Sequence, residues 1–163
     1  MRNREKKLRM HYKDKTKAEL TKEFLEYLIS IKKIKNINTK IHSLATEFAI
    51  DYIKAKIKKN KETIIDPIEI HPGPSKGKDI FIKTNKETHY AEVLCNDSFK
   101  QNEEFKKLQK DMMKLQNVDA TKKYLFILSK KQKEQAKERL RRVGNTLNGV
   151  EFLTIFRSKD GTV

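Results

Sequence analysis

Residues 79–94 have the sequence DIFIKTNKETHYAEVL, which predicts two β-strands joined by a tight turn. The turn is expected at Asn85–Lys86, since two-residue loops are the commonest connection in β-hairpins. With that loop, Lys83 faces Thr88 and Asp79 faces Glu92. The two carboxylates then share one face of the sheet, with Cβ atoms about 5 Å apart.

Two carboxylates at this distance repel each other unless a cation bridges them or one is protonated. Mg²⁺ resolves the repulsion, because it accepts one or two carboxylates together with waters and phosphate oxygens. A three-residue loop would place the acids on opposite faces, and the alternative interpretation is a pair of solvated edge-strand acids. The Gly- and Pro-rich residues 71–78 favour the metal site, since they leave room for a phosphate backbone beside Asp79.

The stretches around this hairpin alternate between helical and strand-like patterns. Apolar residues recur every three to four positions in residues 18–34, 41–59, 101–115 and 131–143, which predicts four helices, the last capped by Gly144. Residues 64–70, 124–128 and 150–156 are expected to be further strands. The order predicts an α/β fold with a mixed central sheet of about five strands flanked by helices.

Composition indicates a nucleic-acid-binding protein. The chain has 163 residues and a net charge of +16, which attracts polyanions. We expect a basic flexible leader at residues 1–17 and a single domain at residues 18–163. No apolar segment is long enough to span a membrane and no signal peptide is visible. The single cysteine, Cys95, favours a reducing cytoplasmic setting and a metal held by oxygen ligands, Mg²⁺ or else Mn²⁺.

Two groups of residues are candidate contacts to DNA phosphates. One lies in the loop before Asp79 and the other on the helix predicted at 131–143, where an ordinary solvated face is the alternative. The candidates are Ser75, Lys76, Lys78, Lys130, Lys131, Lys133, Lys137, Arg141 and Arg142.

Residues 78–82 and 89–94, together with the helix and strand after them, resemble the core of the PD-(D/E)xK nucleases, which include restriction endonucleases and Holliday junction resolvases. The resemblance covers roughly residues 44–128 and implies a restriction-endonuclease-like fold and a Mg²⁺-dependent phosphodiesterase. It implies that Asp79, Glu92 and the backbone carbonyl of Val93 hold the metal. Glu47, on the preceding helix, corresponds to an additional acidic ligand.

The sequence departs from the family at Leu94, where these nucleases have a lysine that orients or activates the attacking water. Three interpretations remain open. Another lysine could substitute, with Lys83, Lys106 and Lys110 as candidates. The protein could instead be a degenerate or partner-dependent nuclease, or an inactive variant.

The predicted function is therefore a metal-dependent DNA endonuclease acting on double-stranded DNA, first a type II-like restriction enzyme and second a junction resolvase. One active site per chain implies a homodimer or a larger recognition subunit. The rival from another class is an inactive nuclease-fold protein that only binds nucleic acid. His89 is expected to be structural, because strand alternation places it on the face away from Glu92; His71 opens the loop and is a weaker candidate for DNA contact.

Overall fold

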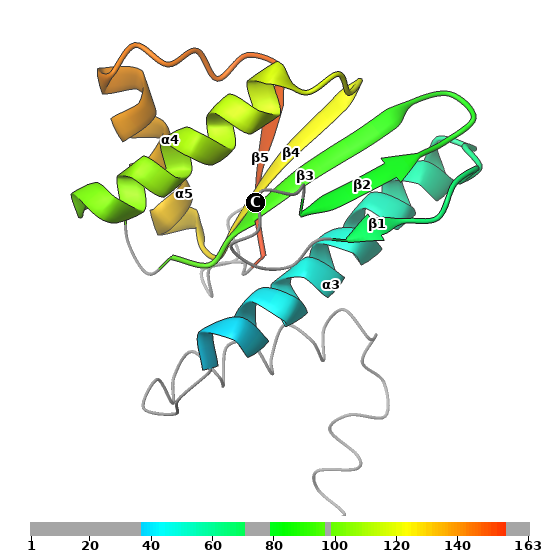
Figure 1. Ribbon diagram of the computed structural model, residues 1–163, viewed down its shortest axis with the longest axis horizontal. Coiled ribbons are helices and arrows are strands. Elements are labelled where there is room, and N and C mark those ends of the chain that lie inside the picture. Colours follow the sequence, from blue (N-terminus) through cyan, green and yellow to red (C-terminus); the bar gives the residue numbers. More distant parts are fainter. Residues whose placement is uncertain (1–36, 71–78, 97–98, 156–163) are drawn as a thin grey trace, which may run out of the picture.

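A computed structural model describes residues 37–70, 79–96 and 99–155. Within them, five strands form one mixed sheet in the order β1-β2-β3-β4-β5 and three helices cover its two faces (Figure 1). The elements are α3 (Ile37–Lys59), β1 (Glu69–Ile70), β2 (Ile80–Lys83), β3 (Thr88–Leu94), α4 (Asn102–Asn117), β4 (Lys122–Ile127), α5 (Lys130–Arg142) and β5 (Val150–Thr154). The predicted α/β class with a five-stranded mixed sheet is confirmed. None of these helices is both long and apolar enough to cross a membrane.

The β2–β3 hairpin has the register that the sequence predicts. The two strands are antiparallel, with Lys83 opposite Thr88 and Phe81 opposite Tyr90. The backbone N–H of Thr84 donates to the carbonyl of Glu87 at 2.9 Å and closes the two-residue loop. Beyond this hairpin, β3, β4 and β5 run parallel, and α4 and α5 provide the crossovers between them.

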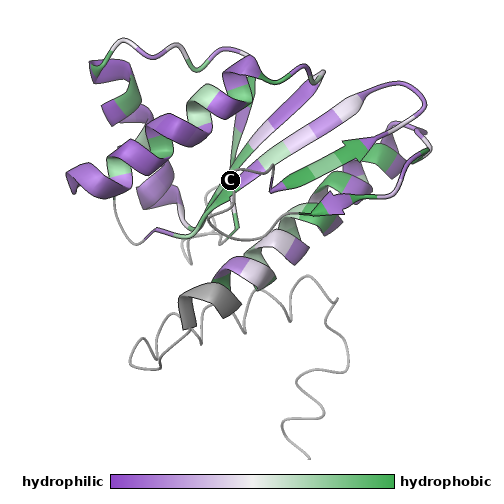
Figure 2. Ribbon diagram, in the orientation of Figure 1, coloured by the Kyte–Doolittle hydropathy of each residue, from purple (hydrophilic) through white to green (hydrophobic). Residues whose placement is uncertain are grey.

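The period of two along β3 divides the core into two layers. Ala91 and Val93 face α3, whereas Tyr90 and Leu94 face the layer that contains α4 and α5. Both layers are apolar, so the middle of the sheet is covered on both sides, as a buried parallel strand requires. Figure 2 shows that α4 also has two kinds of residue, with hydrophobic and hydrophilic stretches following one another along the helix.

Some predicted bounds are wrong, and some fall outside the described residues. The strand expected at residues 64–70 is reduced to β1 and an isolated bridge between Ile64 and Thr84. Pro67 interrupts it, because proline has no N–H to donate to a neighbouring strand. The leader at 1–17, the helix at 18–34 and the loop at 71–78 lie outside the described residues.

The ends of α5 are fixed by local hydrogen bonds. The Ser129 hydroxyl accepts from the N–H of Gln132 at the N-terminus. At the C-terminus, Gly144 has a φ of +73° and the N–H of Asn145 donates to the carbonyl of Leu140, which together form a Schellman cap. Helix α5 therefore ends where the sequence predicts.

One side chain of α5 also holds the segment that leads into α4. The Nη1 group of Arg139 donates to the carbonyls of Phe99, Lys100 and Gln101, the latter two at 2.8 and 3.2 Å. The guanidinium stacks over the ring of Phe105, 4.1 Å from its centroid. Arg139 is thus a structural residue within the basic helix.

Leu108 and Met113 allow a matched test of the core on one helix. Leu108 is fully buried and Met113 is 59% exposed. We expect Leu108→Ala to lower the free energy of unfolding by about 2–5 kcal/mol. Met113→Ala should change it by less than about 0.5 kcal/mol. Urea unfolding measures both, and equal losses would contradict this assignment of the core.

Candidate metal centre

Asp79 and Glu92 lie at the same end of the β2–β3 hairpin. Asp79 directly precedes β2, and the register of the strands carries it to the position opposite Glu92. Both residues are buried, with 6% and 1% of their surface exposed. The Oδ2 atom of Asp79 accepts a hydrogen bond from the N–H of Val93 at 2.9 Å. Three of the four residues expected to provide metal ligands, Asp79, Glu92 and Val93, are therefore neighbours.

Helix α4 brings a lysine to this pair of acids. The Nζ atom of Lys114 lies 3.2 Å from Oε2 of Glu92 and 2.9 Å from Oδ1 of Asp111, three residues earlier on the same helix. The hydroxyl of Tyr90 donates to the other oxygen of Glu92. Both oxygens of the buried carboxylate are thus engaged, one of them by a cation.

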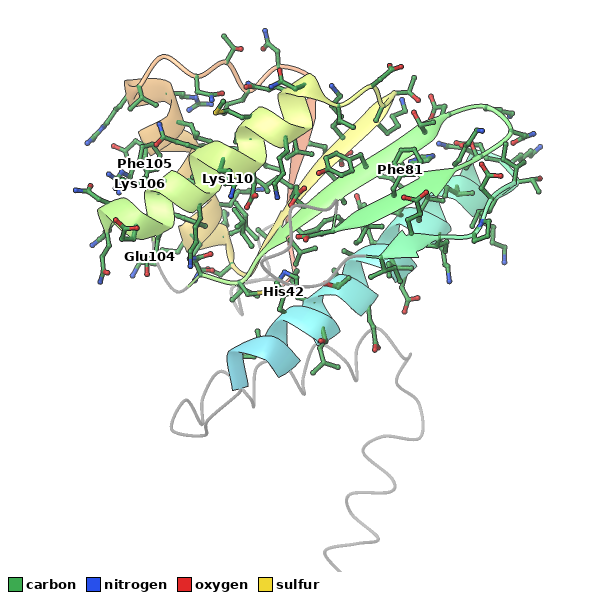
Figure 3. The ribbon with its side chains drawn as sticks, in the orientation of Figure 1. His42, Phe81, Glu104, Phe105, Lys106 and Lys110 are labelled. Carbon is green, nitrogen blue, oxygen red and sulfur yellow. The ribbon has the colours of Figure 1, made fainter. Side chains whose placement is uncertain are left out.

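Helix α3 contributes His42 rather than Glu47. The Nε2 atom of His42 lies 3.1 Å from the carbonyl oxygen of Val93 and 3.7 Å from Oδ2 of Asp79, and Figure 3 shows this side chain between α3 and the strand ends. Glu47 is exposed. Five residues separate it from His42, which turns it about 140° around the helix, away from Asp79.

The pKa values reflect three acids crowded into a poorly solvated place. Burial and the charge of Asp79 raise the pKa of Glu92 to about 7, against the pull of Tyr90 and Lys114. Burial likewise raises the pKa of Asp111. The pKa of Lys114 is also raised, because Asp111 and Glu92 outweigh its burial, so the amine stays protonated. Asp79 and the carbonyl of Val93 raise the pKa of His42, although burial opposes them.

These groups form a donor set suited to a hard divalent cation. With Asp79, Glu92 and Asp111 ionised, one lysine leaves the group net negative inside a strongly basic protein. Mg²⁺ prefers carboxylate and carbonyl oxygens, and Asp79, Glu92 and the Val93 carbonyl provide them. A carbonyl oxygen has two lone pairs, so the contact of Val93 with His42 leaves one for a metal.

The lysines proposed from the sequence lie elsewhere. Lys83 is half-exposed and pairs with Asp66 at 3.3 Å, and Lys106 pairs with Glu103 at 3.2 Å on the exposed side of α4. Lys110 is also exposed; Figure 3 labels it with Lys106 on α4. Leu94 does share the face of Glu92 but is buried in the apolar layer beneath α4.

Sequence reasoning missed four members of this cluster: His42, Tyr90, Asp111 and Lys114. A signal was present in α4, where Leu108, Met112 and Leu115 form the buried stripe. Asp111 and Lys114 border that stripe. When the stripe packs on the sheet face that carries Glu92, both side chains come to lie close to Glu92.

Of the candidate DNA contacts, those on α5 belong to the described residues and those in the loop before Asp79 do not. On α5, Lys130, Lys131, Arg141 and Arg142 are exposed, and Lys133 and Lys137 are partly buried. Arg142 pairs with Glu138, and Lys137 lies over the ring of Phe152 at 5.6 Å. Ser75, Lys76 and Lys78, as well as His71, lie outside the described residues.

No family model matches the chain, and neither the curated proteins nor the solved structures contain a match to it. The site is therefore characterised by the distances, burial and hydrogen bonds given above.

Glu92 should make the stability of the metal-free protein depend on pH. Its pKa is 4.5 in an unfolded chain and about 7 here, so the folded state binds the proton more tightly. The associated stability is complete below about pH 4.5 and is lost as pH rises toward about 7. We expect Glu92→Gln to reduce this loss by about 1–3 kcal/mol.

Urea unfolding between pH 4.5 and 8 in the presence of a chelator measures the slope. The exposed Glu103, changed to Gln, is the matched control and should keep the wild-type slope. A Glu92→Gln protein whose stability falls as steeply as that of the wild type would contradict the assignment.

Proposed function

We propose that the chain is a metal-dependent DNA endonuclease of the PD-(D/E)xK type, in which Lys114 replaces the lysine missing at Leu94. The observation that carries the proposal is the 3.2 Å contact between Lys114 Nζ and the buried Glu92. It supplies a cation at the carboxylate where the family motif requires one. A lysine at position 94 itself would place its charge in an apolar layer, which is costly.

The arrangement of elements supports the same proposal. The resemblance rests on a hairpin with two acids followed by a helix and a strand, and β2, β3, α4 and β4 follow that order. Strand β4 pairs parallel to β3, so α4 crosses the sheet face on which Glu92 lies. A restriction-endonuclease-like fold accounts for both features.

Each residue then has a defined task. A divalent ion held by Asp79, Glu92 and the Val93 carbonyl would lower the pKa of a bound water and offset charge on the phosphate. The ammonium of Lys114 orients that water and attracts the phosphate. Asp111 keeps Lys114 in place from one turn earlier on α4, and Tyr90 fixes the orientation of the Glu92 carboxylate.

The basic residues of α5 are the described candidates for holding the DNA backbone. They lie on the same side of the sheet as α4, and phosphate contacts position DNA without specifying its sequence. A homodimer or a larger recognition subunit would be needed to cut both strands. We favour a restriction-type enzyme, with a junction resolvase as the second candidate.

Lys114→Ala should slow single-turnover cleavage of plasmid DNA in Mg²⁺ or Mn²⁺ by about 10²–10⁴-fold, because a positioned charge that assists proton transfer is lost. Lys110→Ala is the matched control, one turn earlier on α4 and exposed. It should cleave at close to the wild-type rate. If Lys110→Ala or Lys83→Ala abolishes cleavage while Lys114→Ala does not, a different lysine acts.

Asp79→Ala should abolish Mg²⁺ binding and cleavage but retain DNA, since a negative charge near the phosphate is removed. Calorimetry measures the ion and a gel shift measures the DNA. Unchanged Mg²⁺ affinity in this variant would refute the metal centre.

Mapping the cleaved ends separates the remaining candidates. Discrete plasmid fragments identify a restriction-type enzyme, and cutting only at cruciforms identifies a resolvase. A wild-type chain that binds DNA but cuts neither substrate with either metal is a binding protein.

A further inference from the structure

A second cluster of metal-ligating side chains lies at the turn end of the β2–β3 hairpin. Glu62 follows α3, Glu87 directly follows the two-residue hairpin loop and His89 is on β3; one ligand atom from each lies within 4.8 Å of the other two. In Figure 1 the hairpin turn and the C-terminal end of α3 come together at the right of the view. The cluster therefore joins three segments of the chain.

This cluster is distinct from the one around Glu92. His89 is three residues from Glu92 along β3, a separation of about 10 Å. The two side chains also point to opposite faces of the sheet, since the layer with Ala91 and Val93 faces α3. A ligand here would not share a donor with Asp79 or Glu92.

The carboxylate of Glu87 has one buried oxygen that lacks a partner. Its Oε1 atom lies 3.3 Å from Nζ of Lys122. Its Oε2 atom is inaccessible to solvent and accepts no hydrogen bond from any described group. Leaving a charged oxygen buried in this way costs stability, and a bound cation would remove that cost.

Hydrogen bonds around the cluster orient the other two ligands. The hydroxyl of Tyr124 lies 3.1 Å from Nδ1 of His89. The Thr84 hydroxyl donates to Oε2 of Glu62 at 2.7 Å. Metal-bound histidines have their second ring nitrogen held by such a partner, which fixes the tautomer. If Nδ1 donates to Tyr124, the Nε2 atom of His89 turns a lone pair toward Glu62.

The distance between those two atoms agrees with joint coordination of a metal. Nε2 of His89 and Oε2 of Glu62 are 3.2 Å apart. Two ligands on a tetrahedral zinc ion, with bonds of about 2.0–2.1 Å, are about 3.4 Å apart. One imidazole and two carboxylates form a mixed donor set that suits zinc better than magnesium.

We propose that Glu62, Glu87 and His89 bind a zinc ion that clips the end of α3 to the β2–β3 hairpin. A water completes the four ligands. Because the ion joins the segment after α3 to the hairpin and β3, it would hold these segments together. The proposal goes beyond the nuclease function and does not depend on it.

Zinc binding is tested by calorimetry on the full-length chain carrying Asp79→Ala, so that the Asp79–Glu92 site does not contribute. This protein should bind one zinc ion and melt at a higher temperature with it. Adding Glu87→Gln should lower the zinc affinity at least roughly tenfold and abolish the rise in melting temperature. Adding Glu103→Gln, an exposed carboxylate on α4, should change neither.

Tyr124→Phe provides a second variant if Glu87→Gln does not fold. It keeps all three ligands but removes the hydroxyl beside His89, and should weaken zinc binding by about 10–100-fold. Bound Co²⁺ should give the intense visible absorption of a four-coordinate ion in the parent protein and not with Glu87→Gln. Absence of zinc binding by the parent, or equal binding by all the variants, would overturn the proposal.

Discussion

The register of the β2–β3 hairpin is the constraint on which the rest of this structure depends. A loop of two residues places Phe81 opposite Tyr90, and Asp79 comes to lie across from Glu92. The same parity directs His89, Ala91 and Val93 to the layer under α3. A shift of one residue would move every one of these side chains to the other face. Glu92 would then face α3, and Ala91 and Val93 would take its place on the face covered by α4.

The register also determines where negative charge accumulates in a chain with a net charge of +16. Glu92 and Glu62 are both buried, on opposite faces of the sheet and at opposite ends of the hairpin. A buried carboxylate is tolerated only with a partner or a proton. Lys114 and Tyr90 provide partners at Glu92, and His89 and Thr84 provide them at Glu62. Both groups are thus polar networks beside the two apolar layers of the core.

The sequence was sufficient to predict the features that depend on local periodicity. The hairpin, the helices after it, the Gly144 cap and a mixed sheet of five strands all follow from alternation, helical spacing and short connections. The strand predicted at residues 64–70 is largely absent because Pro67 interrupts a segment that is otherwise rich in isoleucine. Strand alternation likewise accounts for Leu94 lying on the face of Glu92.

The sequence did not predict which helix residues contact the buried acids, because that depends on the orientation of each helix about its own axis when it packs on the sheet. Lys83, Lys106 and Lys110 were reasonable substitutes for the missing lysine, since each has a suitable position along the chain. The choice among α4 residues depends on which side of the helix meets Glu92, and that is decided by the packing of Leu108, Met112 and Leu115. For the same reason His42, and not Glu47, is the α3 residue beside Asp79.

The contacts of Arg139 fix the start of α4 to α5. This one guanidinium holds the carbonyls of residues 99–101, from which α4 begins, and stacks on Phe105 in its first turn. Lys114 lies nine residues beyond Phe105, about 14 Å along a helix that behaves as a rod. A small axial shift of α4 at its start would therefore move the ammonium of Lys114 by the same amount relative to the strands. A polyanion that drew Arg139 away from these carbonyls would therefore disturb the position of Lys114 as well as the start of α4.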